Sequence, residues 1–543
     1  MTAPEAEVRE PDIVDVLVIG AGPSGAVVTH TAAAAGLSVI CLEQGDWVNP
    51  SDFPANFPEW ELLIQHNWAH DPNVRGLPSD YPVDVTDSDM WPVMFNAVGG
   101  SSIYYGAEWP RLMPSDFRVK TLDGVSDDWP ISYHDLKPYH DEVDQFIGVS
   151  GLEGDTSYPA GLDYPLPPHP LGKPGMRAAA AANELGWHWW PSDTSIATVD
   201  YEGRGRCLNL GHCTPGCAQG AKASTDITYW PLALRAGVEL RTRARVREIT
   251  VDNNGMATGV VYYDAEGKEQ FQAAEMVIVA CNGVGTPRLM LNSQSGKFPN
   301  GIANSSGLVG KNLMFHPYAF TYGYVDEPLD GNHGPPLCLW SHEFYETDKA
   351  RDFVRGYIFQ FGRGMGSIVE AISSTAAGRL PWGEDHHKVY RSLLNHRIYL
   401  AGICEDLPEE HNRVTLDPML KDSDGIPAPK IDYTVGENSR KMLEHAHSRA
   451  EEILKEAGAH TVFREHVPNS GWHLLGTARM GTDPERSVVN EWGRCHDVKN
   501  LFIVDGSTWV TSGGVNPTST IQALALYIAD AIKQRLANAT LFE

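Results

Sequence analysis

The sequence lacks the marks of secreted, membrane-spanning and disulfide-rich proteins. Its 8 Cys are spread over 543 residues, too sparsely for a disulfide scaffold, so reduced thiols are expected. No run approaches the roughly 20 apolar residues that a bilayer crossing needs. The opening segment MTAPEAEVREPDIVD has neither the basic nor the apolar region of a signal peptide and reads as a short acidic tail. These absences together predict a cytoplasmic protein.

Positive charge is also scarce. Lys and Arg number 42 against 70 Asp and Glu, giving a net charge of −28, which opposes binding to nucleic-acid phosphates or anionic lipid. With 42% hydrophobic and 21% charged residues, the composition is that of an ordinary folded protein, and the length suggests about three to four domain equivalents. A small neutral molecule is therefore the expected partner.

Residues 15–44 carry the strongest local signal. A short apolar run, DVLVIG, predicts a buried parallel strand, and Gly20, Gly22 and Gly25 then form G-x-G-x-x-G before an Ala-rich helix. Such glycines permit a tight turn, close approach of a pyrophosphate and close helix packing, with the helix N-terminus facing the anion. Glu43 ends the next strand, where an acid can hold a ribose hydroxyl. The segment predicts dinucleotide binding.

The rest of the chain predicts a mixture of helices and strands without internal repeats. Residues 50–91 lack periodicity and read as long loops with short helices, the kind of segment that covers an active site. We expect helices at 26–35, 129–151, 223–236, 438–457 and 519–536. We expect strands at 15–20, 38–42, 275–280, 319–325, 354–361, 397–405 and 501–506, and a meander at 238–243, 246–251 and 257–263.

Seven segments together resemble the glucose-methanol-choline (GMC) family of flavoenzymes. They are the N-terminal glycine motif, VGGSSIYYG, VIVACNGVGTPRLMLNS, GLVGKNLMFHP, GWHLLGTARMG, NLFIVDGS and GGVNPTSTIQALA, and they occur in the family's order over nearly the whole chain. The resemblance implies FAD and an α/β fold (α+β overall), in which a Rossmann-type FAD-binding domain accompanies a substrate domain with an antiparallel sheet covered by helices. The FAD-binding domain is expected at 12–130, 201–311 and 465–543, and the substrate domain at 131–200 and 312–464.

The resemblance also assigns cofactor contacts position by position. The motif glycines would face the pyrophosphate, Glu43 the adenosine ribose, and the backbone of Val246 the adenine. Small residues at 99–101 would let the flavin approach, and Asp505 and Gly506 would contact the ribityl and pyrophosphate region. The implied cofactor residues are Gly20, Gly22, Gly25, Glu43, Gly99, Gly100, Ser101, Val246, Asp505, Gly506, Asn516, Pro517 and Thr518.

His473 and Asn516 match the family's catalytic pair. Alcohol oxidation removes a hydroxyl proton and a hydride; a neutral imidazole with a pKa near the working pH suits the first task, and flavin N5 would accept the hydride. His473 lies among small and apolar residues, as a base in a dry pocket would. Asn516 is expected to hydrogen-bond the substrate and, because it precedes Pro517 and a long helix, to act as the N-cap of that helix. The positive end of the helix would then face the flavin.

A loop with three cysteines offers an alternative site. Cys207, Cys213 and Cys217 are spaced C-x5-C-x3-C, with His212 between them. A fourth Cys is missing and the spacing does not fit C-x2-C knuckles, so we expect no metal there. The loop ends in GAKAS and resembles that of bacterial sugar- and glycoside-oxidising members, such as pyranose oxidase-like enzymes and glycoside 3-oxidases or dehydrogenases.

These features predict FAD-dependent oxidation of a secondary hydroxyl of a sugar or glycoside to a ketone, with a 3-keto product favoured. Oxygen or another acceptor would reoxidise the flavin. The alternatives are an oxidase or dehydrogenase of aromatic or aliphatic alcohols, a lyase or decarboxylase of the same fold, or a flavoprotein without catalysis. The His-Asn pair favours hydride abstraction. Because SSIYYG has no His after the flavin loop, non-covalent FAD is expected.

Overall fold

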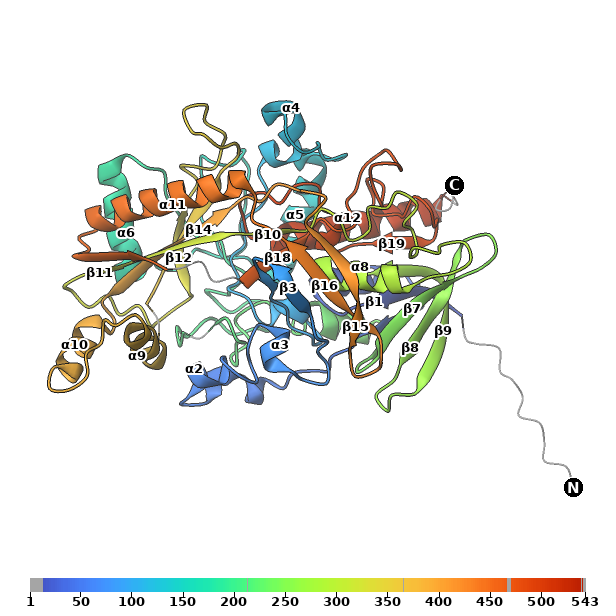
Figure 1. The fold of residues 1–543 in the computed structure, drawn as a ribbon, viewed down its shortest axis with the longest axis horizontal. Helices are drawn as coiled ribbons and strands as arrows, with labels where there is room; N and C mark the ends of the chain where they lie inside the picture. The colour runs from blue at the N-terminus through green and yellow to red at the C-terminus, as the bar shows by residue number, and fades with distance from the viewer. Residues whose placement is uncertain (1–12, 212, 365, 466–469, 539, 541–543) are drawn as a thin grey trace, which may run out of the picture.

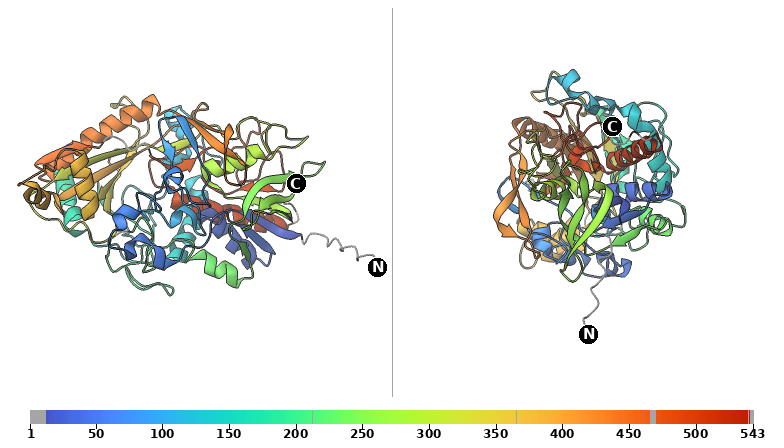
Figure 2. Two further views of the ribbon diagram at one scale, coloured as in Figure 1. Left: turned by 60° about the horizontal axis from the view of Figure 1, so that its bottom comes forward. Right: turned by 90° about the vertical axis from the view of Figure 1, so that its right-hand side faces the viewer.

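The computed structural model describes residues 13–211, 213–364, 366–465, 470–538 and 540; most of the expected acidic tail and His212 lie outside these ranges. Two large sheets occupy opposite ends of the long axis, with smaller sheets and loops between them (Figure 1). Figure 2 shows the same division from two further sides. Among the described helices, none has the length and hydropathy needed to cross a membrane.

The glycine motif follows β1, a strand of a seven-stranded sheet. The strand order is β6-β2-β1-β9-β8-β7, with β19 paired to β9. Strands β6, β2, β1, β9 and β19 are parallel, whereas β7, β8 and β9 form an antiparallel meander. The bounds are β1 Val14–Ile19, β2 Val39–Leu42, β6 Glu239–Arg241, β7 Arg245–Val251, β8 Ala257–Tyr263, β9 Glu269–Val279 and β19 Leu501–Ile503. Because these strands come from three distant parts of the sequence, the predicted split Rossmann-type core is confirmed.

Helices α1 (Pro23–Ala34) and α12 (Thr518–Ala537) pack together beside this sheet. Helix α5 (Tyr133–Ile147) in turn packs on α12, where the Tyr139 hydroxyl donates to Asp530 at 3.1 Å. Although α5 falls in the stretch predicted for the substrate domain, it stands beside the helices of the Rossmann-type core. The domain boundaries themselves stay a prediction.

The second large sheet has six strands in the order β17-β11-β14-β13-β12-β5, and every neighbouring pair is antiparallel. The bounds are β5 Trp190–Pro191, β11 Tyr318–Tyr324, β12 Leu337–Ser341, β13 Tyr357–Gly362, β14 Arg397–Cys404 and β17 Thr461–Arg464. Helix α11 (Glu437–Glu456) lies across it (Figure 1), burying a stripe that includes Met442, Ala446 and Ala450. Helix α6 (Gly172–Leu185) packs against the same core.

Two three-stranded sheets lie between the large ones. One has the order β10-β18-β4 and the other β15-β16-β3. Their bounds are β3 Asp84–Ser88, β4 Trp91–Pro92, β10 Met314–His316, β15 Arg413–Lys421, β16 Pro427–Tyr433 and β18 Ser470–Leu475. The first of these sheets carries the predicted catalytic histidine. The loops expected over 50–91 include the short helices α2 (Trp60–Leu63) and α3 (Pro72–Arg75), and between these helices the ring of His70 lies 5.0 Å from that of Trp472 on β18.

Some elements differ from the sequence prediction. The helix expected at 223–236 is only α7 (Tyr229–Arg235). The backbone N–H of Trp230 donates to the carbonyl of Thr225, five residues back, at 3.0 Å, so residues 225–228 form turns and not an α-helix. Strand β6 pairs parallel with β2 and does not join the meander. Helix α8 (Asn282–Asn292) was not among the helices expected from the sequence. The remaining helices are α4 Val119–Asp123, α9 Ser367–Ala376 and α10 His386–Leu393.

Candidate active site

A cavity of about 400 Å³ runs from the carboxyl ends of β1 and β2 to the six-stranded sheet. Ligands of doubly wound sheets bind outside the carboxyl ends of the parallel strands, so this position agrees with the glycine motif. Where the cavity reaches the six-stranded sheet, its wall includes Tyr318, Phe320, Gln360, Tyr399 and Ala401. His473 and Asn516 line the same cavity.

Two glycine loops meet at the floor of the cavity. Gly20 has a φ of +102°, and a Cβ there would lie 2.4 Å from a backbone carbonyl oxygen. A Cβ on Gly100 would lie 2.8 Å from the Cα of Gly22. The backbone N–H of Gly99 donates to the carbonyl of Ala21 at 2.9 Å and joins the loops. Side chains are thus excluded, and the exposed backbone suits a pyrophosphate.

Carboxylates hold the turns beside this floor. Glu43 is buried, and its two oxygens accept from the backbone N–H groups of Ala21 and Gly45, each at 2.8 Å. Asp505 accepts from the backbone N–H of Asn282 at 3.1 Å and of Ser507 at 2.8 Å. Burial raises the pKa of both carboxyls, while their hydrogen bonds act in the opposite direction. The glycine floor, the start of α1 and Glu43 together have the chemistry that a dinucleotide requires.

All but two of the predicted cofactor residues line the cavity. The exceptions are Gly25 and Gly99, which are not part of its wall. A Cβ on Gly25 would lie 2.0 Å from the carbonyl oxygen of Gly20, and one on Gly99 would lie 3.1 Å from the side chain of Asp226. Both glycines therefore permit close packing behind the floor. The individual contacts of the other residues with the cofactor stay predictions.

His473 stands at a β-bulge. Strand β18 pairs antiparallel with β10, but the register shifts between Met314 and His316, so that His473 and Leu474 together face one residue of β10. His473 has a φ of +69°, in the left-handed region that few residues other than glycine adopt. Bulges bend a strand and change the direction of a side chain, often beside an active site.

A second histidine fixes the tautomer of the first. Nε2 of His316 lies 2.5 Å from the carbonyl oxygen of Gly513; because a carbonyl only accepts, this nitrogen carries the hydrogen. Nδ1 of neutral His316 then has a lone pair, and it lies 2.8 Å from Nδ1 of His473. His473 must therefore donate from Nδ1. Its Nε2 is left with a free lone pair, the atom that a base uses.

Both rings are neutral at neutral pH. Burial lowers the pKa of His473 well below its ordinary value, and the neighbouring His316 acts in the same direction. Burial also lowers the pKa of His316 to about 4, although its bond to Gly513 opposes the shift. The sequence prediction of a pKa near the working pH is therefore wrong: desolvation keeps His473 in its basic form but makes it a weaker base.

Asn516 is held by a glutamine that sequence reasoning missed. The Gln360 amide on β13 is buried and donates from Nε2 to Oδ1 of Asn516 at 2.5 Å. The N–H groups of Asn516 are then left to donate to a ligand in the cavity. Pro517 occupies the N-cap position of α12 and no side chain caps the helix. The predicted N-cap role of Asn516 is wrong, because its oxygen is already engaged by Gln360.

A buried lysine ties the cysteine loop to the segment after the flavin loop. Nζ of Lys222 donates to the carbonyls of Ile103 (2.8 Å) and Tyr105 (3.1 Å), and to those of Cys213 (2.6 Å) and Thr214 (3.3 Å). Burial lowers the pKa of Lys222 to about 8. The four carbonyls replace the hydrating water that the ammonium group of Lys222 loses on burial.

The three thiols of this loop are electrostatic neighbours. Burial raises the pKa of Cys213 to about 12, and Cys207 and Cys217 add to the shift. Among the described residues, however, these three thiols are not a group whose ligand atoms all lie within 4.8 Å of one another. The expectation of no metal stays a prediction, and metal analysis of the purified protein decides it.

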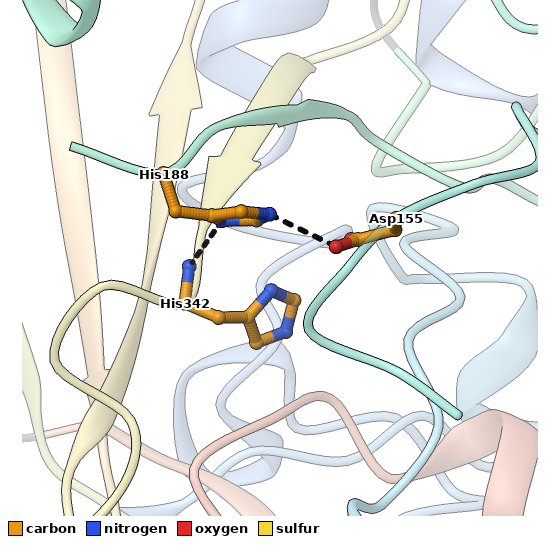
Figure 3. A group of neighbouring side chains, drawn as sticks. All are labelled: Asp155, His188 and His342. Carbon is orange, nitrogen blue, oxygen red and sulfur yellow. Dashed lines mark hydrogen bonds and ion pairs between the residues drawn. The ribbon is translucent and has the colours of Figure 1, made fainter. Parts of the chain in front are cut away.

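Asp155, His188 and His342 converge from three segments of the substrate side (Figure 3), with ligand atoms within 4.8 Å of one another. The backbone N–H of His342 donates to Nδ1 of His188 at 3.2 Å. Nε2 of His188 therefore carries a hydrogen, which it donates to Asp155 at 2.9 Å. Because this nitrogen is a donor, the group is a hydrogen-bonded link between loops, and we assign no metal to it.

Comparisons with known proteins agree with this site. Two family models, both described as GMC oxidoreductase, match residues 172–318 and 408–525. The chain is 45% identical over 538 residues to 2-methyl-1,2-propanediol dehydrogenase of Mycolicibacterium austroafricanum, covering 97% of this chain and 96% of that one. It is 31% identical to 6'''-hydroxyparomomycin C oxidase of Streptomyces lividus, covering 96% and 92%. Pyridoxine 4-oxidase from Mesorbium loti shares the fold, with a TM-score of 0.63 at 17% identity, covering 96% of this chain and 99% of that one.

Family membership follows from the sequence identity of this chain to two relatives over nearly its whole length. The cavity and its glycine floor agree with it. The predicted resemblance, the fold class and the cofactor are thereby confirmed. The chain belongs to the GMC oxidoreductase family and is an FAD-dependent alcohol oxidoreductase.

Proposed function

We propose that this enzyme oxidises one hydroxyl group of a polyhydroxylated substrate, with His473 as the base that accepts the hydroxyl proton. The observation that carries the proposal is the tautomer of His473. Its Nδ1–H donates a hydrogen bond to His316, so Nε2 carries the free lone pair, and His473 lies in the wall of the cavity. A buried neutral imidazole is suited to accept a proton from an alcohol.

Asn516 complements the base. Its N–H groups are free to donate to the oxygen of the hydroxyl that His473 deprotonates, and this hydrogen bond strengthens as negative charge develops on that oxygen. Gln360 holds the amide in this orientation through the 2.5 Å bond to Oδ1. FAD, when bound along the glycine floor, supplies the two-electron acceptor for the carbon-bound hydrogen. The protein's share of the chemistry is thus proton transfer and orientation.

The relatives favour one class of substrate over another. The 45% identical relative is named for a small aliphatic diol, which supports the aliphatic branch of the alternatives over the sugar that the sequence favoured. The 31% identical relative is named for an aminoglycoside, so a sugar or glycoside remains the second candidate. A 3-keto product has no support beyond the resemblance. Both relatives are named as oxidising enzymes, which disfavours a lyase or a decarboxylase.

The electron acceptor and the location complete the proposal. Oxygen and other acceptors are both compatible with the family. The excess of acidic residues supports a small-molecule partner over nucleic acid or anionic membrane. The cytoplasmic location stays a prediction.

An anaerobic screen tests the proposed function. Aliphatic diols, sugars, glycosides and aromatic alcohols are mixed with the purified holoenzyme, and bleaching of the flavin absorbance is followed. Small diols should bleach it, and sugars are the next class expected to do so. Protein that releases no FAD on denaturation, or whose flavin is reduced by none of these alcohols, would contradict the proposal.

A further inference from the structure

Tyr318 presents an unpaired hydroxyl group to the cavity. It is the first residue of β11, lines the cavity and is 9% exposed. Its hydroxyl has no hydrogen-bond partner among the described residues, yet it is not one of the unpartnered polar atoms that are fully buried. Because the side chain forms part of the cavity wall, the exposed surface of this hydroxyl faces the cavity. The hydroxyl is therefore available to a ligand.

The position of Tyr318 distinguishes it from the other tyrosines of the wall. The hydroxyls of Tyr104 and Tyr399 also have no hydrogen-bond partner in the described part of the chain, and both residues line the cavity. The ring of Tyr318 packs against that of the proposed base His473, with the centroids 6.2 Å apart. Among the described residues, neither Tyr104 nor Tyr399 makes such a contact with His473.

The hydroxyl of Tyr318 and the proposed base can thus contact one small molecule. Tyr318 follows His316 by two positions, and His316 is hydrogen-bonded to His473. A hydrogen bond joins heavy atoms about 2.8 Å apart, so two such bonds span a distance comparable to the separation of the two rings. A substrate that is held at Nε2 of His473 by one hydroxyl can therefore reach Tyr318 with a nearby second one.

The charge state of the wall indicates which group it suits. Burial raises the pKa of Tyr318 above its ordinary value, and Tyr399 adds to the shift, so the hydroxyl stays neutral. A neutral phenol both donates and accepts a hydrogen bond. Its neighbours in this wall, Phe320, Ala401 and Gln360, are uncharged. An uncharged hydroxyl fits here, whereas an ammonium or a carboxylate would be buried without an opposite charge.

We propose that Tyr318 binds a second hydroxyl group of the substrate, one that is not oxidised and lies one or two carbons from the oxidised one. This inference rests on the proposed function and adds the residue that selects diols and polyols over monohydroxy alcohols. A site that hydrogen-bonds a hydroxyl rejects analogues without it, because the polar group of the site is left unpaired. Phe320, which stacks on Tyr318 at 5.3 Å, offers an apolar face to the carbon skeleton.

The test removes one hydroxyl from the substrate and one from the enzyme. The substrate is the best diol or polyol from the anaerobic screen, and the analogue lacks its second hydroxyl; for 2-methyl-1,2-propanediol the analogue is 2-methyl-1-propanol. In the unaltered holoenzyme, kcat/KM should be about 10- to 100-fold lower for the analogue. Tyr318→Phe should lower kcat/KM for the parent alcohol by a similar factor and leave that of the analogue unchanged, so that the two become equivalent.

Two matched variants remove other tyrosine hydroxyls. Tyr324→Phe, on the same strand, deletes a hydroxyl that donates to Glu370 at 2.6 Å outside the cavity wall. Tyr399→Phe deletes the unpaired hydroxyl of a neighbour in the wall. Both variants should retain the discrimination between the two alcohols. FAD content and the pH profile of flavin reduction are measured for each variant, and Tyr318→Phe should match the unaltered enzyme in both.

Several results would overturn the inference and leave alcohol oxidation by His473 intact. One is an equal kcat/KM for parent and analogue in the unaltered enzyme, which decides the matter even if Tyr318→Phe cannot be purified. Another is undiminished discrimination in Tyr318→Phe. Equal slowing of both alcohols would assign Tyr318 to the placement of His473, and loss of FAD would assign it to the cofactor. An enzyme whose flavin no alcohol reduces contradicts the proposed function, and this inference with it.

Discussion

Nδ1 of His316 lies 2.8 Å from Nδ1 of His473, while the far nitrogen of His316 is bound to the carbonyl of Gly513. The direction of both hydrogens follows from that carbonyl, because it can only accept. His316 therefore acts through His473 as a positioning residue. This arrangement leaves the free lone pair on Nε2 of His473. We therefore expect different effects from replacing His473 and from replacing His316.

Replacing the base should stop proton transfer without releasing the cofactor. His473→Ala is expected to slow anaerobic flavin reduction by roughly 10² to 10⁴, the usual range for a lost general base. FAD content should stay unchanged, because the glycine floor is formed elsewhere. Stopped-flow absorbance measures the rate, and a normal rate across the whole pH range would assign the base to another group.

Replacing the positioning residue should have a smaller effect with a different signature. His316→Phe removes the acceptor for Nδ1–H of His473, so either tautomer becomes accessible, and we expect flavin reduction to slow by about 10- to 100-fold, as for other outer-shell partners. The apparent pKa of the rate should fall, because His316 is uncharged in this pH range and its lone pair, which accepts from Nδ1–H of His473, stabilises the protonated ring. A slower rate with an unchanged pH profile would indicate a packing role alone.

The pH dependence of stability has a definite sign. An unfolded His titrates near 6.5, whereas the pKa of His316 in the fold is about 4. Between these values the unfolded chain binds more protons, so the free energy of unfolding should fall as the pH decreases from about 6.5 to about 4. His473 contributes in the same direction. Denaturant titrations at several pH values should show less of this loss in His316→Phe; an equal loss would indicate that other groups cause it.

Asn516 and Gln360 should behave as a coupled pair. Asn516→Ala is expected to slow flavin reduction and to leave the buried Gln360 amide without its acceptor, at about 1–3 kcal/mol of stability. Because Asn516 does not cap α12, Asn516→Ser should not recover this loss by capping. Adding Gln360→Leu to Asn516→Ala should recover stability but not activity. Recovery by Ser alone would restore the capping interpretation.

The glycine floor allows a matched test of cofactor binding. Gly100→Ala places a Cβ 2.8 Å from the Cα of Gly22 and strains a φ of +54°, so the purified protein should contain much less FAD. Gly36→Ala also strains a positive φ, of +87°, but its Cβ meets open space. Flavin absorbance per chain should fall in the first variant and not in the second. Equal FAD content in both would remove Gly100 from the cofactor site.

The sequence predicted the features that have a local pattern. The glycine motif, the strands beside it and the helices at 438–457 and 519–536 have the period or motif of their structure. The prediction failed where local preference is weak, as in α8, which contains Gly283, Gly285 and Pro287. It also failed at the shortened α7, where turns take the place of the first residues of the expected helix.

Within the site, the proposed base and its partner amide could be predicted from the sequence, but the residues that hold them could not. His316 and its acceptor Gly513 are 197 positions apart, and Gln360 and Asn516 are 156 apart. Such pairs leave no spacing pattern in a single sequence.

Because of the bulge in β18, the direction of the His473 side chain depends on the number of residues in that strand. Side chains along a regular strand alternate between its two faces, so a shift of one residue moves each of them to the opposite face. Here two residues of β18 share the place of one on β10. Deleting Leu474 would allow regular pairing and would remove the need for the positive φ at His473 that sets the direction of the imidazole. An enzyme with every catalytic side chain retained could thus be inactivated by the loss of one apolar residue that takes no part in the chemistry.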